Sequence, residues 1–154
     1  MPTVAVSGPE DCNCLAVRQA ARHITQFYDQ FLAASGLRTT QFSILAKLRR
    51  AGPMTIKALA ADLVMDRTTL GRNILPLERD GLVAVEKGRH DRRSKSLRLT
   101  EAGVARFRTA AKAWAQAQRH FEAAFGAKRT TDMRALLHAV AATDLGSDTV
   151  TAEE

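Results

Sequence analysis

Apolar residues recur at steps of three and four along most of this 154-residue chain, which is the spacing of amphipathic helices. The first such segment extends from Leu15 to about Ala34. A second follows Thr39 or Thr40, either of which can serve as its N-cap, and the Ala-Gly-Pro sequence at 51–53 ends it. The first half of the chain therefore begins with two helices.

Two short helical segments come next, with very little chain between them. Thr55 is a suitable N-cap for an apolar-faced segment over 56–63, and Asp66 is one for the segment that Gly81 ends. Two short helices joined by a minimal turn are typical of a helix-turn-helix. Pro76 lies inside the second segment and should bend it there.

A hairpin and two more helices complete the pattern. Residues 81–85 and 96–100 have the alternation of strands, and a charged stretch lies between them. A long helix is expected from about Thr100, a break at 126–130, and a last helix after it. The predicted fold class is mainly α, with a small β-wing beside a helix-turn-helix.

Charge is distributed unevenly along the chain. Residues 38–98 contain 14 Lys and Arg against 6 Asp and Glu, whereas the remainder carries 9 against 10. A basic excess that is confined to one segment indicates a surface for a polyanion such as DNA. The alternative is a solvated basic face that has no partner.

The helix that follows Asp66 and the tip of the hairpin provide the groups that such a surface needs. Guanidinium, amide and hydroxyl groups contact base edges and phosphates in DNA grooves. Asp91 lies two residues before Arg93, with which it can pair and so fix its direction. The predicted DNA-binding residues are Arg67, Thr68, Thr69, Arg72, Asn73, Arg89, Asp91, Arg92, Arg93 and Lys95.

The segment DGLVAVEKGRHDRRSKSLRLTEAG, residues 80–103, resembles the wing signature of the MarR-type winged-helix regulators. The order of the predicted elements also resembles that family, over about residues 13–142. The resemblance implies a homodimer, interlocked by the first and last helices, that binds a pseudo-palindromic double-stranded operator. It also implies a transcriptional repressor that is released by a small effector, often phenolic or aromatic, or by cysteine oxidation.

With the resemblance, the chain divides into five parts. Residues 1–12 form an irregular N-terminal arm, 13–37 a dimerisation helix, 38–99 the winged helix-turn-helix lobe, 100–142 the C-terminal dimerisation helices, and 143–154 a disordered tail. Tyr28 and Trp114, on helices that flank the lobe, are candidates for an effector pocket, although such aromatic residues are more often part of a core.

The two cysteines, Cys12 and Cys14, lie together before the first helix. One hypothesis is a thiol-based redox switch or a soft-metal or metalloid site, because thiolates bind soft ions. The alternative is a pair of reduced cysteines without a role. Since four histidines show no metal-ligand spacing, the sequence defines no other metal site.

Other classes of protein fit less well. The chain has no phosphate-binding glycine loop, nucleophile elbow or paired-carboxylate motif, so neither an enzyme nor a cofactor is expected. A methyltransferase with a winged-helix lobe would need a Rossmann domain, for which 154 residues leave no room. A helical interaction module without DNA binding remains as an alternative. No apolar run is long enough for a membrane span and no signal peptide is present, so we expect a cytoplasmic protein.

Overall fold

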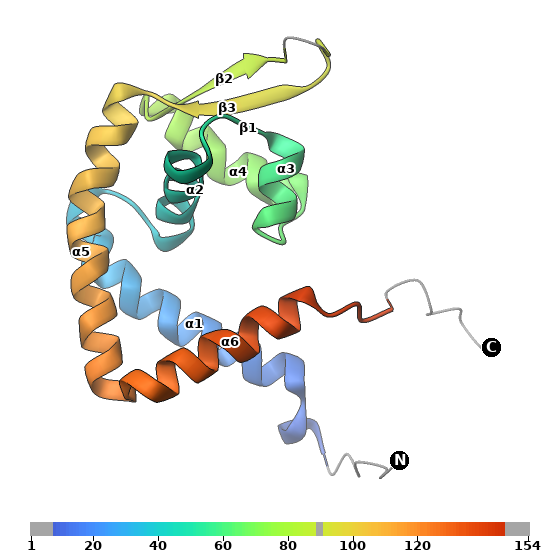
Figure 1. Cartoon of the computed structure of the whole chain (residues 1–154), viewed down its shortest axis with the longest axis vertical. Helices are drawn as coiled ribbons and strands as arrows, with labels where there is room; N and C mark the ends of the chain where they lie inside the picture. The colour runs from blue at the N-terminus through green and yellow to red at the C-terminus, as the bar shows by residue number, and fades with distance from the viewer. Residues whose placement is uncertain (1–7, 89–90, 147–154) are drawn as a thin grey trace. The chain divides into compact units, whose positions relative to one another are not determined.

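The computed structural model describes residues 8–88 and 91–146. The chain forms two compact units, Met1–Ala117 and Gln118–Glu154, which are treated separately below. Helix α5 begins in the first unit and ends in the second (Figure 1).

The first unit contains most of the secondary structure. Its elements are the 3-10 turn Pro9–Asp11, α1 (Asn13–Leu32), the 3-10 turn Ala33–Ser35, α2 (Thr39–Ala51), β1 (Met54–Thr55), α3 (Ile56–Asp62), α4 (Arg67–Arg79), β2 (Val83–Lys87), β3 (Lys95–Leu99) and α5 (Glu101–Phe125) as far as Ala117. The second unit contains the rest of α5 and helix α6 (Ala127–Ala142). The predicted mainly α fold with a small wing is confirmed.

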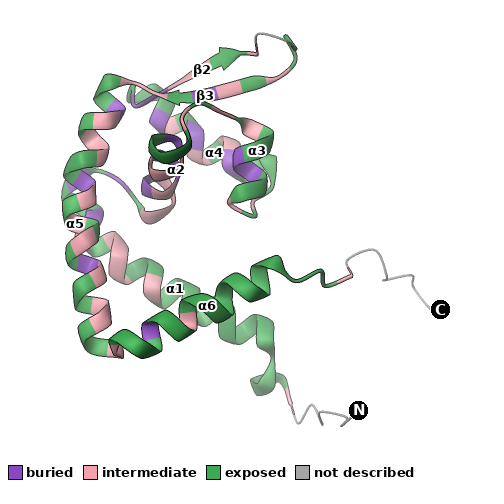
Figure 2. Ribbon diagram, viewed as in Figure 1, coloured by how far each residue is buried: buried purple, intermediate pink, exposed green. Residues whose placement is uncertain are grey.

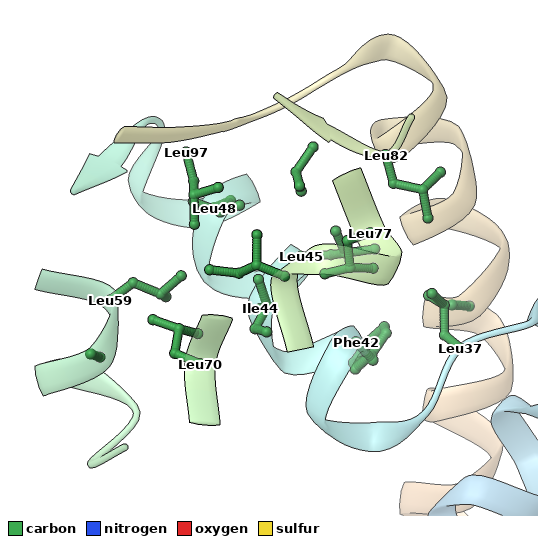
Figure 3. Close-up of a cluster of buried hydrophobic side chains, with 14 of the residues drawn as sticks. Leu37, Phe42, Ile44, Leu45, Leu48, Leu59, Leu70, Leu77, Leu82 and Leu97 are labelled. Atoms are coloured by element: carbon green, nitrogen blue, oxygen red, sulfur yellow. The ribbon is translucent and has the colours of Figure 1, made fainter. Parts of the chain in front are cut away.

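The core of the first unit lies between α2, α3, α4 and the wing. Leucine and isoleucine side chains from all four converge there, and their helices show the predicted apolar faces (Figure 3). Ile44, Leu45, Leu59, Leu70 and Leu97 are completely buried. Each buried side chain of this size stabilises the fold by roughly 1.5–3 kcal/mol relative to an exposed one.

The wing is a three-stranded antiparallel sheet in the order β1-β3-β2. Leu97 of β3 lies opposite both Met54 of β1 and Val85 of β2. The hairpin was predicted, although β2 begins and ends two residues later than expected. Strand β1 was not predicted, because two residues form no pattern of their own and pair only with a distant strand.

Thr100 joins the wing to α5 and to the end of α4. Its hydroxyl donates to the carbonyl of Gly81 at 2.6 Å and accepts from the N–H of Gly103 at 3.0 Å. Its own N–H donates to the carbonyl of Leu82 at 3.1 Å. A Cβ atom at Gly103 would lie only 2.0 Å from that Leu82 carbonyl oxygen, so only glycine permits this approach.

The turn between α3 and α4 contains Val64 in a left-handed conformation, with φ of 51°. This conformation is unfavourable for a β-branched residue. The side chain is 75% exposed, so little packing offsets the strain. The caps on either side are as predicted: Thr55 accepts from the N–H of Ala58, and Asp66 accepts from the N–H of Thr69.

The start of α2 differs from the prediction. The N-cap position is Arg38, and Thr39 is the first helical residue rather than the cap. Asp29, from α1, accepts hydrogen bonds from both the N–H and the hydroxyl of Thr39, each at 2.7 Å. The Asp29 carboxylate, ten residues before Thr39, therefore caps the start of α2, where a threonine side chain was expected to do so.

Three smaller expectations also change. The break expected at 126–130 is confined to Gly126, whose φ of 101° ends α5, and α6 begins at the next residue. The described part of the N-terminal arm contains the 3-10 turn Pro9–Asp11, so it is not wholly irregular. Residues 1–7 and 147–154, and with them most of the arm and the tail, lie outside the described residues.

Two helices bury little apolar surface within one chain. In α1 only Leu32 is fully buried, and in α6 only Thr130 is (Figure 2). Leu136, Leu137 and Val140 of α6 are exposed by 68%, 41% and 54%.

Within the second unit, the guanidinium of Arg129 lies 4.2 Å from the centroid of the Phe125 ring.

Replacing Gly103 by alanine should destabilise the protein by about 1–3 kcal/mol, because the new Cβ must displace the Leu82 backbone. The matched control is Gly71→Ala in α4, where a Cβ would meet nothing within 4 Å. There the higher helix propensity of alanine should stabilise the protein by about 1 kcal/mol. Chemical denaturation of both variants measures the difference. Equal effects of the two changes would contradict the close approach at Gly103.

Candidate nucleic-acid interface

Helix α4 presents a polar face because its apolar face is packed into the core. Leu70, Ile74 and Leu77 are buried on one side. Arg67, Thr68 and Arg72, three of the predicted DNA-binding residues, are exposed. No hydrogen bond or ion pair within the described part of the chain engages the side chains of these three residues. They are therefore available to a partner.

Two other predicted contacts on α4 are partly occupied by the helix itself. The hydroxyl of Thr69 donates to the Asp66 carboxylate at 2.7 Å, and the amide of Asn73 donates to the Thr69 carbonyl at 2.9 Å. The Thr69 hydroxyl, followed by the Thr69 N–H, holds the pKa of Asp66 below its usual value. The cap should therefore be complete above the ordinary aspartate pKa and weaken as the pH falls through the lowered one.

The C-terminal part of α4 offers less unpaired positive charge to a partner than the N-terminal part does. The helix continues through Pro76 to Arg79, as a continuous helix. The Nε atom of Arg79 lies 3.3 Å from the Asp80 carboxylate, so its charge is paired locally. The exposed cationic surface of α4 is thus concentrated in its first half.

The tip of the wing is shaped by Asp91. Its carboxylate accepts the backbone N–H of Arg93 at 2.9 Å, and its carbonyl accepts the N–H and hydroxyl of Ser94. The ion pair expected between the Asp91 and Arg93 side chains is not among those of the described residues. Asp91 fixes the turn through the backbone instead, because an aspartate readily accepts from the amide two residues ahead. Arg89 lies outside the described residues.

Not all of the positive charge on the hairpin is free. Arg98 on β3 forms an ion pair with Glu86 on β2, and these two residues lie on neighbouring strands. Arg92, Arg93 and Lys95 are exposed and form no ion pair within the described chain. The free cations are therefore nearer the tip than the root of the wing.

A groove of about 360 Å³ brings the wing together with the starts of α3 and α4. Cationic side chains from three elements line it: Lys57 from α3, Arg67 from α4, and Arg93 and Lys95 from the wing. Of these, Arg67, Arg93 and Lys95 were predicted as contacts, together with Asp91, which also lines the groove.

Four residues of this groove were not predicted as contacts from the sequence: Thr55, Ile56, Lys57 and Ser94. Lys57 follows the Thr55 cap by two residues, which places it in the exposed first turn of α3. Its position in that first turn was the one feature of the sequence that could have indicated an exposed cation there. Nothing local to the sequence indicates that this turn lies beside the wing.

A second pocket, of about 370 Å³, lies between α1, α2 and α5 within the first unit. Tyr28 and Trp114 both line it, together with Phe42 and Lys47. The Phe42 and Trp114 rings are stacked with their centroids 6.0 Å apart. The two residues predicted for an effector pocket therefore line one apolar cavity, and Lys47 is a lining residue that the sequence did not indicate.

Both cysteines are exposed at the start of α1. Cys12 is the N-cap of that helix, and its sulfur accepts the N–H of Leu15 at 3.4 Å. Within the described residues, no group of three or more His, Cys, Asp and Glu side chains is placed to hold a metal ion. None of the described helices is sufficiently long and apolar to cross a membrane.

Two consecutive helices, α3 and α4, followed directly by an antiparallel hairpin, define a winged helix-turn-helix (Figure 1). The MarR family profile matches residues 37–95, which include α2, the helix-turn-helix and the start of β3. The transcriptional regulator MosR of M. tuberculosis, in a crystal structure with DNA, is 39% identical. That match covers 84% of this chain and 96% of that one, with a TM-score of 0.73. The chain belongs to the MarR family.

Two curated relatives are similar over a shorter stretch. The uncharacterized HTH-type transcriptional regulator YwoH of Bacillus subtilis is 36% identical over 85 residues, which are 55% of this chain and 61% of that protein. The transcriptional activatory protein BadR of Rhodopseudomonas palustris is 35% identical over 88 residues, 55% of this chain and 50% of that protein. The chain therefore spans only about half to three fifths of these relatives.

Proposed function

We propose that this protein is a dimeric transcriptional regulator that binds a pseudo-palindromic DNA site through α4 and the wing. The observation that carries the proposal is the groove in which Lys57, Arg67, Arg93 and Lys95 meet. Four cations from three elements match a phosphate backbone, whereas the exposed Arg72 on α4 is placed for base edges. The similarity to MosR, crystallised with DNA, supports the same partner.

Dimer formation is the second part of the proposal. Exposed apolar side chains occur on both α1 and α6. They include Leu15 and Val17 on α1, and Leu136 and Val140 on α6. Exposed large apolar side chains that gather on one helix are typical of an interaction surface, and each of the two helices carries such side chains. In a two-fold dimer the two α4 helices would lie about one DNA turn apart, ~34 Å, as a pseudo-palindrome requires.

Regulation by a small aromatic or phenolic molecule is the third part, with the protein acting as a repressor that this effector releases. The pocket that Tyr28 and Trp114 line has the size and apolar character of a small-molecule site. It touches α1 on one side and α2 on the other. A ligand there would contact both the proposed dimer helix and the DNA-binding lobe.

Thiol sensing through Cys12 and Cys14 is a second candidate, favoured by one observation. The Cys12 sulfur caps α1, so oxidation or binding of a soft metal or metalloid at this sulfur would remove an acceptor from the start of that helix. Since α1 is a proposed dimer helix, thiol chemistry could then change the spacing of the two lobes.

Arg72→Ala and Arg93→Ala should each weaken DNA binding by ~1–3 kcal/mol while leaving the melting temperature unchanged, because both side chains are exposed. DNA flanking the protein's own gene is a suitable target for gel shifts. Arg108→Ala, an exposed arginine on α5, is the control. Parental binding should also weaken steeply with salt. Binding that is insensitive to salt and to both substitutions would favour an interaction module without a DNA role.

Light scattering at micromolar concentration should give twice the mass of one chain. Leu136→Glu on α6 should shift the protein towards monomer, because it places a charge on an exposed apolar face. Leu75→Glu is the matched control, since Leu75 is a comparably exposed leucine on α4. A monomeric parent, or a dimer that Leu136→Glu leaves intact, would rule out this assembly.

Peroxide or a thiol-binding metalloid should lower the DNA affinity of the parent relative to reductant if the cysteines act as a switch. The double variant Cys12→Ser, Cys14→Ser should not respond. Serine is a favourable N-cap, so this variant removes the thiols while keeping the start of α1. Equal affinity of the parent in all three conditions would show that the cysteines are not the switch.

A further inference from the structure

Lys47 takes part in two features of the lobe at once. It lines the pocket between α1, α2 and α5, and its Nζ atom lies 2.8 Å from the carboxylate of Asp62. Asp62 is the last residue of α3, the first helix of the helix-turn-helix. The lysine therefore links the pocket directly to the DNA-binding elements.

Polar interactions join helix α2 to neighbouring helices at two points, and a residue from each point lines the pocket. At its start, Asp29 of α1 holds the N–H and hydroxyl of Thr39. Further along, Lys47 holds Asp62 of α3. Thr39 and Lys47 both line the pocket. A ligand bound there lies beside the two polar ties that join α2 to its neighbours.

Among the polar groups that line this pocket, the ammonium of Lys47 carries a positive charge and therefore favours an anion beside it. The Thr39 hydroxyl donates to Asp29, and the Ser43 hydroxyl donates to the Thr39 carbonyl at 3.0 Å, so both protons are already used. Lys47 is the charged residue among those that line the pocket in the described chain. Its ammonium has three donors and a side chain that is 42% exposed, so it is accessible to a second acceptor.

We propose that Lys47 is the residue through which an aromatic carboxylate in this pocket acts on the helix-turn-helix, by exchanging Asp62 for the ligand. This inference rests on the effector pocket of the proposed function. The ligand's ring would pack against Tyr28 and Trp114, with its carboxylate at Lys47. One positive charge neutralises one carboxylate, so the bound ligand weakens the tie to Asp62.

The loss of that tie has a direct effect on α3. Asp62 places a negative charge at the C-terminal end of the helix, where it is unfavourable with the helix dipole. Lys47 offsets this charge. When the lysine turns to the ligand, the last turn of α3 is destabilised, and α3 carries Lys57 at its other end in the DNA groove. Weaker DNA binding follows.

The experiment uses benzoate and its uncharged counterpart benzamide as probes, with two readouts on the full chain. Fluorescence of Trp114, the single tryptophan, reports occupancy of the pocket. Anisotropy with labelled DNA reports DNA affinity. The variants are Lys47→Gln, Asp62→Asn and the two combined. Asp132→Asn is the control, since it removes another lysine–aspartate pair, Lys128–Asp132 at 2.6 Å on α6.

In the parent, benzoate should alter the fluorescence and weaken DNA binding several-fold, and benzamide should bind less tightly. Lys47→Gln should lower benzoate affinity about tenfold, to the level of benzamide, since a charge-assisted hydrogen bond is lost. Asp62→Asn should retain benzoate binding and bind DNA about as tightly as the parent without ligand, because an uncharged side chain at the end of α3 needs no lysine to offset it. Benzoate should not weaken DNA binding by this variant. The double variant should be no weaker on DNA than either single one. Asp132→Asn should behave like the parent.

The outcomes separate this inference from the proposed function. If benzoate binds and releases DNA equally from the parent and from Asp62→Asn, the effector pocket stands and the exchange at Lys47 is wrong. Parental benzoate affinity in Lys47→Gln would overturn the exchange as well. If benzoate changes neither readout of the parent at millimolar concentration, both the effector pocket and the exchange fail. A parent that does not bind DNA overturns the proposed function itself.

Discussion

The hydrogen bonds of Thr100 hold the DNA-binding lobe together at one point. One hydroxyl bonds the end of the α4 turn, at Gly81, to the first turn of α5, at Gly103. The Thr100 N–H bonds the Leu82 carbonyl, immediately before β2. The close contact between Gly103 and the Leu82 carbonyl is possible only without a side chain. These contacts therefore couple the end of α4, the root of the wing and the start of α5 to one another.

Ion pairs in this lobe direct charge more than they stabilise the fold. Exposed pairs such as Arg98 with Glu86, or Arg79 with Asp80, contribute only ~0–1 kcal/mol each to stability. Their positions matter because they neutralise cations at the root of the wing and at the end of α4. The cations in the groove between α3, α4 and the wing remain unpaired within the described chain. The positive field is thereby concentrated there.

Much of the fold could be predicted because its signals are local. The helices follow the three- and four-residue spacing of apolar side chains, and the caps Thr55 and Asp66 bond amides three residues ahead. The features that were missed depend on residues far apart in sequence. Strand β1 exists only because it pairs with β3, and the start of α2 is capped by Asp29 from another helix.

The candidate site divides in the same way. Exposure of Thr68 and Arg72 follows from helical periodicity, because both lie opposite the apolar face of α4, so it was predictable. The place of Lys57 beside the wing, and of Lys47 between the pocket and Asp62, follows from packing and was not. Asp91 was correctly singled out as a residue that shapes the tip of the wing, although it does so through the backbone of Arg93 rather than through its guanidinium.

The left-handed Val64 has a consequence for the fluctuations of the folded lobe. Strain of this kind, of order 1–3 kcal/mol, exists only while the turn between α3 and α4 is closed, and it is released when the turn opens. It therefore lowers the free energy of local opening without altering the buried contacts of the core. Helix α3 is also only 7 residues long, so it has few hydrogen bonds with which to resist opening. The helix-turn-helix should be the part of the lobe that exchanges its amide hydrogens through the smallest, most frequent openings.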